Sequence, residues 1–178
     1  MDARRTGGLV IITAILAALP IAAAANEPRD RADVTSAPNN PETTLSTPWI
    51  SSKVPTPVRS KIEASFHVAS QRLVESPPCR DLFADLGADG LETLSSTLFY
   101  PASAAHEKRL CGGAWGYTTV GAAPTFLCRK FSRLSDQRGA MILIHEALHH
   151  AGMDEWPNDS TGLTSKAINS LVEDACGL

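Results

Sequence analysis

The clearest hydrophobic pattern begins at Pro57, where apolar residues recur every three or four positions on one face of a helix. These residues are Val58, Ile62, Phe66, Ala69 and Leu73. Pro77 and Pro78 end the pattern, and Thr56 followed by Pro57 is typical of an N-cap with proline in the first turn. The sequence therefore predicts an amphipathic support helix of about five turns.

Beyond this helix the apolar positions form shorter runs. We expect short helical pieces around 81–86 and 91–95, and β-strands at 97–100, 114–120 and 125–131. The residues GAAP separate the last two runs and are typical of a turn, so these two strands are expected to pair as a hairpin. This part of the chain predicts a short antiparallel sheet.

Two further helices are predicted towards the C-terminus. The first runs through MILIHEALHHA, with Ser135 or Asp136 as its cap and Gly152 just beyond its end. The second begins at about Thr164, and its apolar face consists of Ile168, Leu171 and Val172. The order of helix, small sheet, helix and helix predicts the α+β fold class.

The first 25 residues have the three-part layout of a secretory signal peptide. Arg4 and Arg5 precede an apolar run over 9–19, and small residues follow at 21–25. The apolar run is shorter than the roughly 20 residues that a membrane-spanning helix needs. We therefore expect cleavage near the end of the small residues and a secreted or periplasmic protein without stable membrane insertion. An uncleaved signal anchor is the alternative.

Residues 26–56 are rich in Pro, Ser, Thr, Asn and Asp and poor in apolar side chains. Such a segment buries too little surface to offset the entropy lost on ordering, so we expect a disordered spacer. A propeptide is the alternative interpretation of the same residues. The folded domain is then expected to span 57–178.

Charge and cysteine usage narrow the class of protein. The chain of 178 residues carries 16 basic and 19 acidic side chains and no long basic block, which argues against nucleic acid and against an anionic membrane as partners. An even number of cysteines in an exported protein predicts two disulfides. The four cysteines are Cys79, Cys111, Cys128 and Cys176, and the sequence leaves their three possible pairings open.

The candidate chemistry lies in the first C-terminal helix, which contains HEALHH. His145 and His149 are four residues apart, so their imidazoles project from nearly the same side of the helix and can reach one ion. Glu146 lies at the edge of that site. This HExxH arrangement predicts a zinc ion that acidifies a water molecule and a glutamate that takes its proton. His150 stands about 100° further round the helix, which favours a structural role.

A hydrolytic zinc site needs a third protein ligand, and two carboxylates are candidates. Glu155 lies ten residues after His145 and beyond the expected turn at Gly152, so the chain can reverse and return this carboxylate to the ion. Glu173 lies on the last helix, which could pack against the first and present its carboxylate across it. The reach of the chain and the glycine favour Glu155, with Glu173 as the alternative.

The segment HEALHHAGMDE resembles the signature of the zincin metallopeptidases. Its frame, HExxHxxGxxE, is similar to that of the metzincins with glutamate in the third ligand place, which implies a turn at Gly152 and zinc ligation by Glu155. The gluzincin plan would instead give that place to Glu173. The wider layout over 79–178 resembles small exported bacterial proteins of the zincin type. The resemblance also implies that the hairpin edge binds extended peptide.

These features predict an exported zinc metalloendopeptidase that hydrolyses a peptide or protein substrate, with Glu146 as the general base. Tyr117 is a candidate for stabilising the oxyanion, against the packing role that aromatic residues usually have. The alternative function is a non-catalytic secreted module, metal-binding or protein-interacting, on the same fold. Glu146 separates the two functions, because a purely structural metal site has no need of it.

Overall fold

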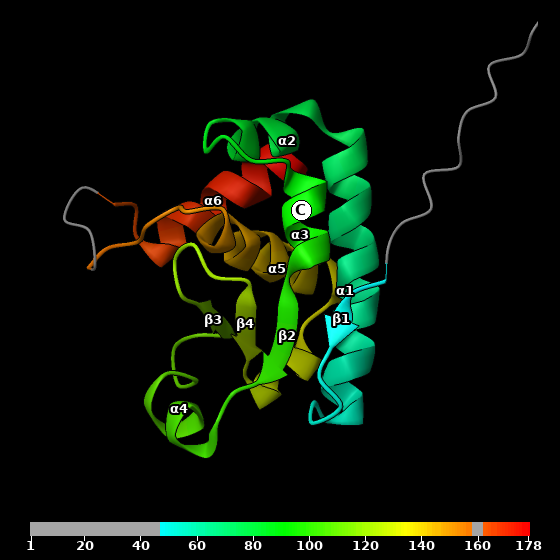
Figure 1. The fold of residues 1–178 in the computed structure, drawn as a ribbon, viewed down its shortest axis with the longest axis vertical. Coiled ribbons are helices and arrows are strands. Elements are labelled where there is room, and N and C mark those ends of the chain that lie inside the picture. Colours follow the sequence, from blue (N-terminus) through cyan, green and yellow to red (C-terminus); the bar gives the residue numbers. More distant parts are fainter. Residues whose placement is uncertain (1–46, 158–161) are drawn as a thin grey trace, which may run out of the picture. The chain divides into compact units, whose positions relative to one another are not determined.

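The computed structural model describes residues 47–157 and 162–178, which all belong to one unit of the chain, Glu42–Leu178. This part contains six α-helices and a four-stranded sheet, a mixed α/β fold (Figure 1). In chain order the elements are β1 (Trp49–Ile50), α1 (Thr56–Glu75), α2 (Pro77–Ala84), α3 (Gly90–Ser96), β2 (Leu98–Pro101), α4 (Ala104–Arg109), β3 (Gly116–Thr118), β4 (Pro124–Leu127), the 3-10 turn η1 (Arg129–Arg133), α5 (Asp136–His150) and α6 (Ser165–Cys176). The predicted signal peptide and residues 26–46 of the predicted spacer lie outside the described residues.

The predicted support helix is confirmed as α1, and the apolar residues that predicted it are all buried. The predicted cap was wrong, because Pro55 occupies the N-cap and Thr56 is already the first helical residue. The N–H groups of the first helical turn have no partner within the helix, so a proline there loses no helical hydrogen bond. Pro57 therefore fits the second helical position as well as it would fit the first.

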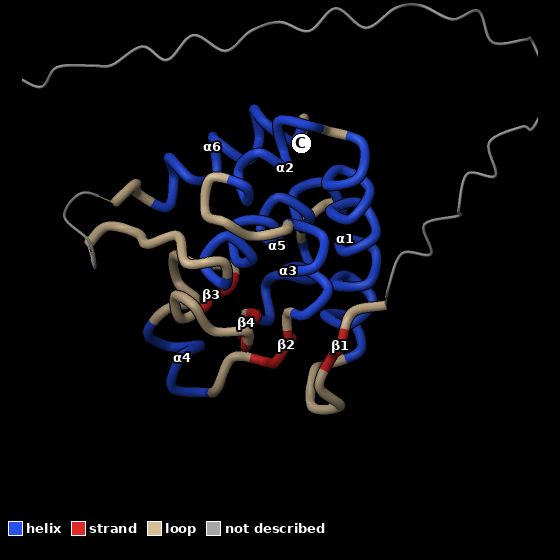
Figure 2. Tube along the Cα trace, turned by 45° about the horizontal axis from the view of Figure 1, so that its top comes forward, coloured by secondary structure: helices blue, strands red, loops and turns tan. Residues whose placement is uncertain are grey.

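The sheet has the strand order β1-β2-β4-β3. The predicted hairpin is confirmed, since β3 and β4 pair antiparallel with Tyr117 opposite Phe126. The sheet as a whole is mixed and not antiparallel as predicted, because β2 pairs parallel with both β1 and β4. Phe99 of β2 and Leu127 of β4 are buried in one hydrophobic core with side chains of α1 and α5. Figure 2 shows these helices together on one side of the strands.

The predicted spacer extends too far, because residues 47–56 belong to the folded unit. Ile50 of β1 pairs with Phe99 of β2, the Ser51 N–H donates to the Phe99 carbonyl, and Val54 is 4% exposed. A strand of two residues is too short to show the period-two alternation that identifies strands, so the polar composition around it dominated the prediction.

Helix α4 was not predicted either. It begins after Ser103, whose side chain caps it by accepting from the His106 N–H. None of its residues is buried, so it leaves no apolar stripe in the sequence. Figures 1 and 2 show α4 beyond the β3 side of the sheet, away from the other helices.

Both predicted disulfides are present. Cys79–Cys176 joins α2 to α6, and Cys111–Cys128 joins the segment before β3 to the residue after β4. Disulfides persist in oxidising compartments, which fits the expected export. Within the described ranges, every helix is too short or too polar to cross a membrane.

Candidate metal centre

The centre is built on α5, which begins where Ser135 accepts a hydrogen bond from the Arg138 N–H, as one of the two predicted caps. The apolar run before His145 buries this helix, and the two histidines are themselves only 4% and 6% exposed. One helical turn separates His145 from His149, and their Nε2 atoms lie 3.0 Å apart. The predicted convergence of the two imidazoles is therefore confirmed.

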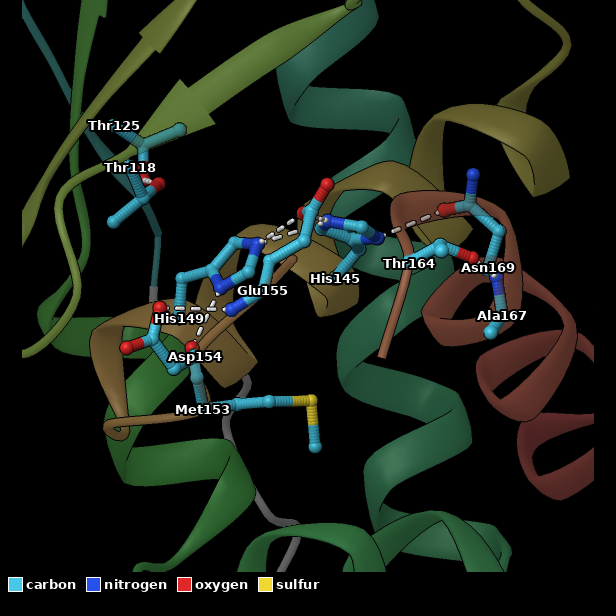
Figure 3. A network of polar contacts seen from close by, with 10 residues as sticks. All are labelled: Thr118, Thr125, His145, His149, Met153, Asp154, Glu155, Thr164, Ala167 and Asn169. Atoms are coloured by element: carbon cyan, nitrogen blue, oxygen red, sulfur yellow. Dashed lines mark hydrogen bonds and ion pairs between the residues drawn. The ribbon is translucent and has the colours of Figure 1, made fainter. Parts of the chain in front are cut away.

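A turn at Gly152 brings the third member of the group into place. Gly152 has a φ of 109°, a backbone conformation that favours glycine, and it directly follows Ala151, the C-cap of α5. The chain then reverses, so that Glu155 Oε2 lies 3.1 Å from His149 Nε2 and 3.5 Å from His145 Nε2 (Figure 3). The ligand atoms of these three residues all lie within 4.8 Å of one another, a group that could hold a metal ion.

The hydrogen bonds at the other ring nitrogens define how the imidazoles face the group. His145 Nδ1 lies 2.8 Å from Asn169 Oδ1 on α6, and His149 Nδ1 lies 2.7 Å from the Met153 carbonyl oxygen. Both partners are acceptors, so each Nδ1 carries a hydrogen and each neutral ring holds its lone pair on Nε2. Two lone pairs and a carboxylate oxygen thus converge, and a cation between them removes their mutual repulsion.

Glu146 lies beside this group and is only 5% exposed. Its Oε2 is buried and has no hydrogen-bond partner among the described residues. Burial raises the pKa of this carboxyl, against the lowering effects of the two histidines and of a hydrogen bond with Thr118. A buried carboxylate oxygen without a partner is costly, so the arrangement favours an added polar group at this point.

Strand β3 leaves space for Glu146 because its first residue is glycine. A Cβ at Gly116 would lie 2.8 Å from Leu127 Cδ2 and 3.3 Å from Glu146 Oε1. Two residues further on, the Thr118 hydroxyl lies 2.7 Å from that of Thr125. Gly116 and Thr118 therefore form the face of β3 that is turned towards the carboxylate.

The charges of the group act on one another. For His145, burial lowers the pKa, but the hydrogen bond with Glu155 and the charges of Glu146 and Glu155 outweigh it, so that the pKa is raised. For Glu155, burial raises the pKa, but the hydrogen bond with His145 and the charges of both histidines outweigh it, so that the pKa is lowered. Both shifts favour the pairing of a protonated His145 with an ionised Glu155 when no metal ion is bound.

The structure separates the two candidates for the third ligand. Glu155 lies with the histidines, whereas Glu173 forms an ion pair with Arg138 of α5. His150 also lies apart from the group, since its Nδ1 is 3.3 Å from Thr97 Oγ1 and burial lowers its pKa. Its contact with Thr97 agrees with the predicted structural role.

Tyr117 is among the residues that line the cleft at this centre, but its ring and hydroxyl contact residues outside the metal group. Its ring stacks on Phe126 with centroids 5.0 Å apart, and its hydroxyl is hydrogen-bonded to His106 Nδ1 of α4. Side chains alternate between the two faces of a strand, so Tyr117 points away from the face that Gly116 and Thr118 turn to Glu146. These contacts offer no support for an oxyanion role.

A cleft of about 380 Å³ opens onto the centre. Apolar and aromatic residues make up much of its wall, among them Leu110, Trp115, Val120, Ile142 and Trp156. Among the described residues that line it, only Glu146 and the three members of the metal group are acids or histidines, and none is Lys or Arg. The cleft is therefore largely uncharged away from the centre.

Sequence reasoning missed Asn169, Gly116 and Thr118 as parts of the site. Asn169 carried one local signal, because asparagine lowers the stability of a helix interior. An asparagine inside a helix therefore suggests that its side chain makes a specific contact. The other two act through the packing of β3 on α5, which no local pattern encodes. No protein family, curated protein or solved structure gives a significant match to this chain.

Proposed function

We propose that the protein is an exported zinc metalloendopeptidase of the zincin type, with zinc held by His145, His149 and Glu155. The observation that carries the proposal is the convergence of two Nε2 lone pairs and one carboxylate oxygen beside the buried, unpartnered Oε2 of Glu146. A structural cation site would explain the first feature, but it would not explain a second carboxylate that is held at its edge and does not ligate the ion.

The donor set fits zinc. Two imidazole nitrogens and one carboxylate oxygen are the protein ligands of a catalytic zinc site, which keeps one position open. When bound there, zinc would polarise the substrate carbonyl and lower the pKa of water. The hydrogen bonds at both Nδ1 atoms would hold the rings so that their Nε2 lone pairs could bind such an ion.

Glu146 would move the protons of the reaction. Its Oε2 is free to accept a proton from the attacking water, and the same oxygen can return that proton to the nitrogen of the departing amine. Burial favours the protonated carboxyl, which this second step requires. The close approach of β3 at Gly116 would hold the side chain in place between the two steps.

The surroundings favour an internal peptide bond as the substrate. Exopeptidases that act at a free carboxyl end need a cation to bind it, and no Lys or Arg among the described residues lines the cleft. Strand β3 is an edge strand and contributes to the same cleft, so its unpaired backbone groups could bind an extended peptide by strand addition. The apolar wall would accept uncharged side chains.

The first test is metal content, measured by elemental analysis of the exported, disulfide-intact protein and of its His149→Ala variant. We expect about one zinc per chain in the wild type and its loss in the variant. A well-folded wild type without stoichiometric metal would contradict the proposal.

The second test separates catalysis from metal binding. The Glu146→Gln variant should keep its zinc and lose hydrolysis of labelled, unfolded casein by at least about a hundredfold. Hydrolysis by this variant at the wild-type rate would refute the role given to Glu146. A wild type that binds zinc but cleaves no peptide bond would favour the non-catalytic metal-binding module instead.

A further inference from the structure

Asn169 reaches the metal group from a different helix. It lies on α6, 24 positions after His145, and its Oδ1 is 2.8 Å from His145 Nδ1 (Figure 3). An amide oxygen can only accept, so the imidazole must donate its Nδ1–H to it. The contact therefore selects one of the two neutral tautomers of His145.

The selection matters because competing partners lie on the other side of the ring. His145 Nε2 lies 3.0 Å from His149 Nε2 and 3.5 Å from Glu155 Oε2, and these acceptors attract a hydrogen onto that nitrogen when no metal ion is bound. A hydrogen on Nε2 would block the lone pair that a metal ion needs. The amide of Asn169 favours the opposite tautomer.

We propose that Asn169 is a positioning residue, which fixes the Nδ1–H tautomer and the ring plane of His145 and thereby sets the zinc affinity of the site. This inference rests on the proposed function insofar as zinc is the ion bound. The corresponding contact of His149 is made by a backbone carbonyl, that of Met153, which no side-chain substitution removes. Of the two Nδ1 hydrogen bonds, only that of Asn169 can thus be removed by a side-chain substitution.

The helix that carries Asn169 is anchored well enough to serve this role. Ile168 and Val172 are fully buried on either side of it, and Cys176 is bonded to Cys79 of α2. Precise support for a ligand requires such a fixed element. A purely structural explanation is weaker, because asparagine lowers helix stability and the side chain of Asn169 makes no other hydrogen bond with the described residues.

Two substitutions separate the hydrogen bond from the shape of the side chain. Asn169→Leu keeps a similar size and removes the acceptor. Asn169→Asp keeps an acceptor oxygen at the same place and adds a negative charge, as in the carboxylate–histidine–metal arrangement. Ser170→Ala is the matched control, since Ser170 is the next residue of α6 and is exposed.

The first readout is the tautomer of His145 in the metal-free protein, obtained from the nitrogen NMR shifts of the imidazole at a pH where both rings are neutral. We expect the Nδ1–H form in the wild type, in Asn169→Asp and in Ser170→Ala, and a substantial Nε2–H population in Asn169→Leu. This readout needs no metal, so it tests Asn169 even if the proposed function fails.

The second readout is the affinity for Zn²⁺ alone, measured by competition with a fluorescent chelator. Asn169→Leu should bind about 10- to 100-fold more weakly than the wild type, whereas Asn169→Asp should bind at least as tightly as the wild type. Should Asn169→Leu fail to fold, as judged by circular dichroism, Asn169→Ala takes its place with the same expectation.

Wild-type tautomer and wild-type zinc affinity in Asn169→Leu would overturn the inference. Equal weakening in the Leu and Asp variants would also overturn it, because the shared loss would then come from packing and not from the acceptor. Absence of zinc binding in the wild type would instead count against the proposed function, while the tautomer measurement would still decide the role of Asn169.

Discussion

Replacing Gly116 by alanine should injure the site without touching a metal ligand. The added methyl carbon would lie 2.8 Å from Leu127 Cδ2 and 3.3 Å from Glu146 Oε1, where ordinary carbon contacts need about 3.5 Å or more. Leu127 is 1% exposed and cannot move into solvent, so β3 or the leucine must shift by several tenths of an ångström. Overpacking of this kind costs about 1–3 kcal/mol.

The expected consequences can be measured separately. The melting temperature by circular dichroism should fall by about 3–10 °C for a folded unit of this size. Hydrolysis of labelled casein should fall by about tenfold to a hundredfold, because small displacements of a catalytic group are costly, while zinc content stays at the wild-type level. The control is Gly113→Ala, since a Cβ at Gly113 meets no atom within 4 Å. A Gly116→Ala protein as stable and as active as this control would refute the close-packing argument.

Three further predictions follow from the centre and its anchors. Glu155→Gln should weaken zinc binding by at least about a hundredfold, whereas Glu173→Gln should leave it unchanged; equal affinities by chelator competition would contradict the assignment of the third ligand. The raised pKa of His145 implies that, without metal, its protonated form stabilises the fold below the unfolded pKa of roughly 6.5. This stability is lost as the pH rises through the folded pKa. Urea unfolding in the presence of a chelator should therefore show lower stability at pH 8 than at pH 6. The Cys79–Cys176 disulfide has a sequence separation of 97 and the Cys111–Cys128 disulfide one of 17, so the first closes the longer loop and restricts the unfolded chain more. Its removal should therefore lower the free energy of unfolding by about 1–2 kcal/mol more than removal of the second. The reverse order in urea unfolding would contradict this argument.

The sequence predicted the parts of the centre that local geometry controls. Helical spacing determines that His145 and His149 share a side of α5, and a glycine turn close to the helix end is enough to return Glu155 to them. Whether Glu155 or Glu173 completed the group depended on how α6 packs, and the spacing could only favour one of them. The ion pair of Glu173 with Arg138 is a tertiary contact of this kind.

The parts that were missed depend on contacts between distant segments. Asn169 meets His145 only because α6 packs on α5, and the four cysteines pair according to the same packing. Strand β1 shows a different limit, because two residues cannot display a period. Its identity comes from its pairing with β2, so composition alone assigned it to the spacer.

Strand alternation also constrains Tyr117, whose role was open in the sequence. Because Gly116 and Thr118 face Glu146, the residue between them must face away, where its hydroxyl meets His106 and its ring stacks on Phe126. Tyr117→Phe preserves the stacking and removes only the hydrogen bond to His106, so hydrolysis of casein should stay within about threefold of the wild type. Tyr117→Ala should lower the melting temperature, since it removes the ring that packs the edge strand on the sheet. A loss of a hundredfold or more in the phenylalanine variant, at unchanged zinc content and stability, would restore Tyr117 as the group that stabilises the oxyanion.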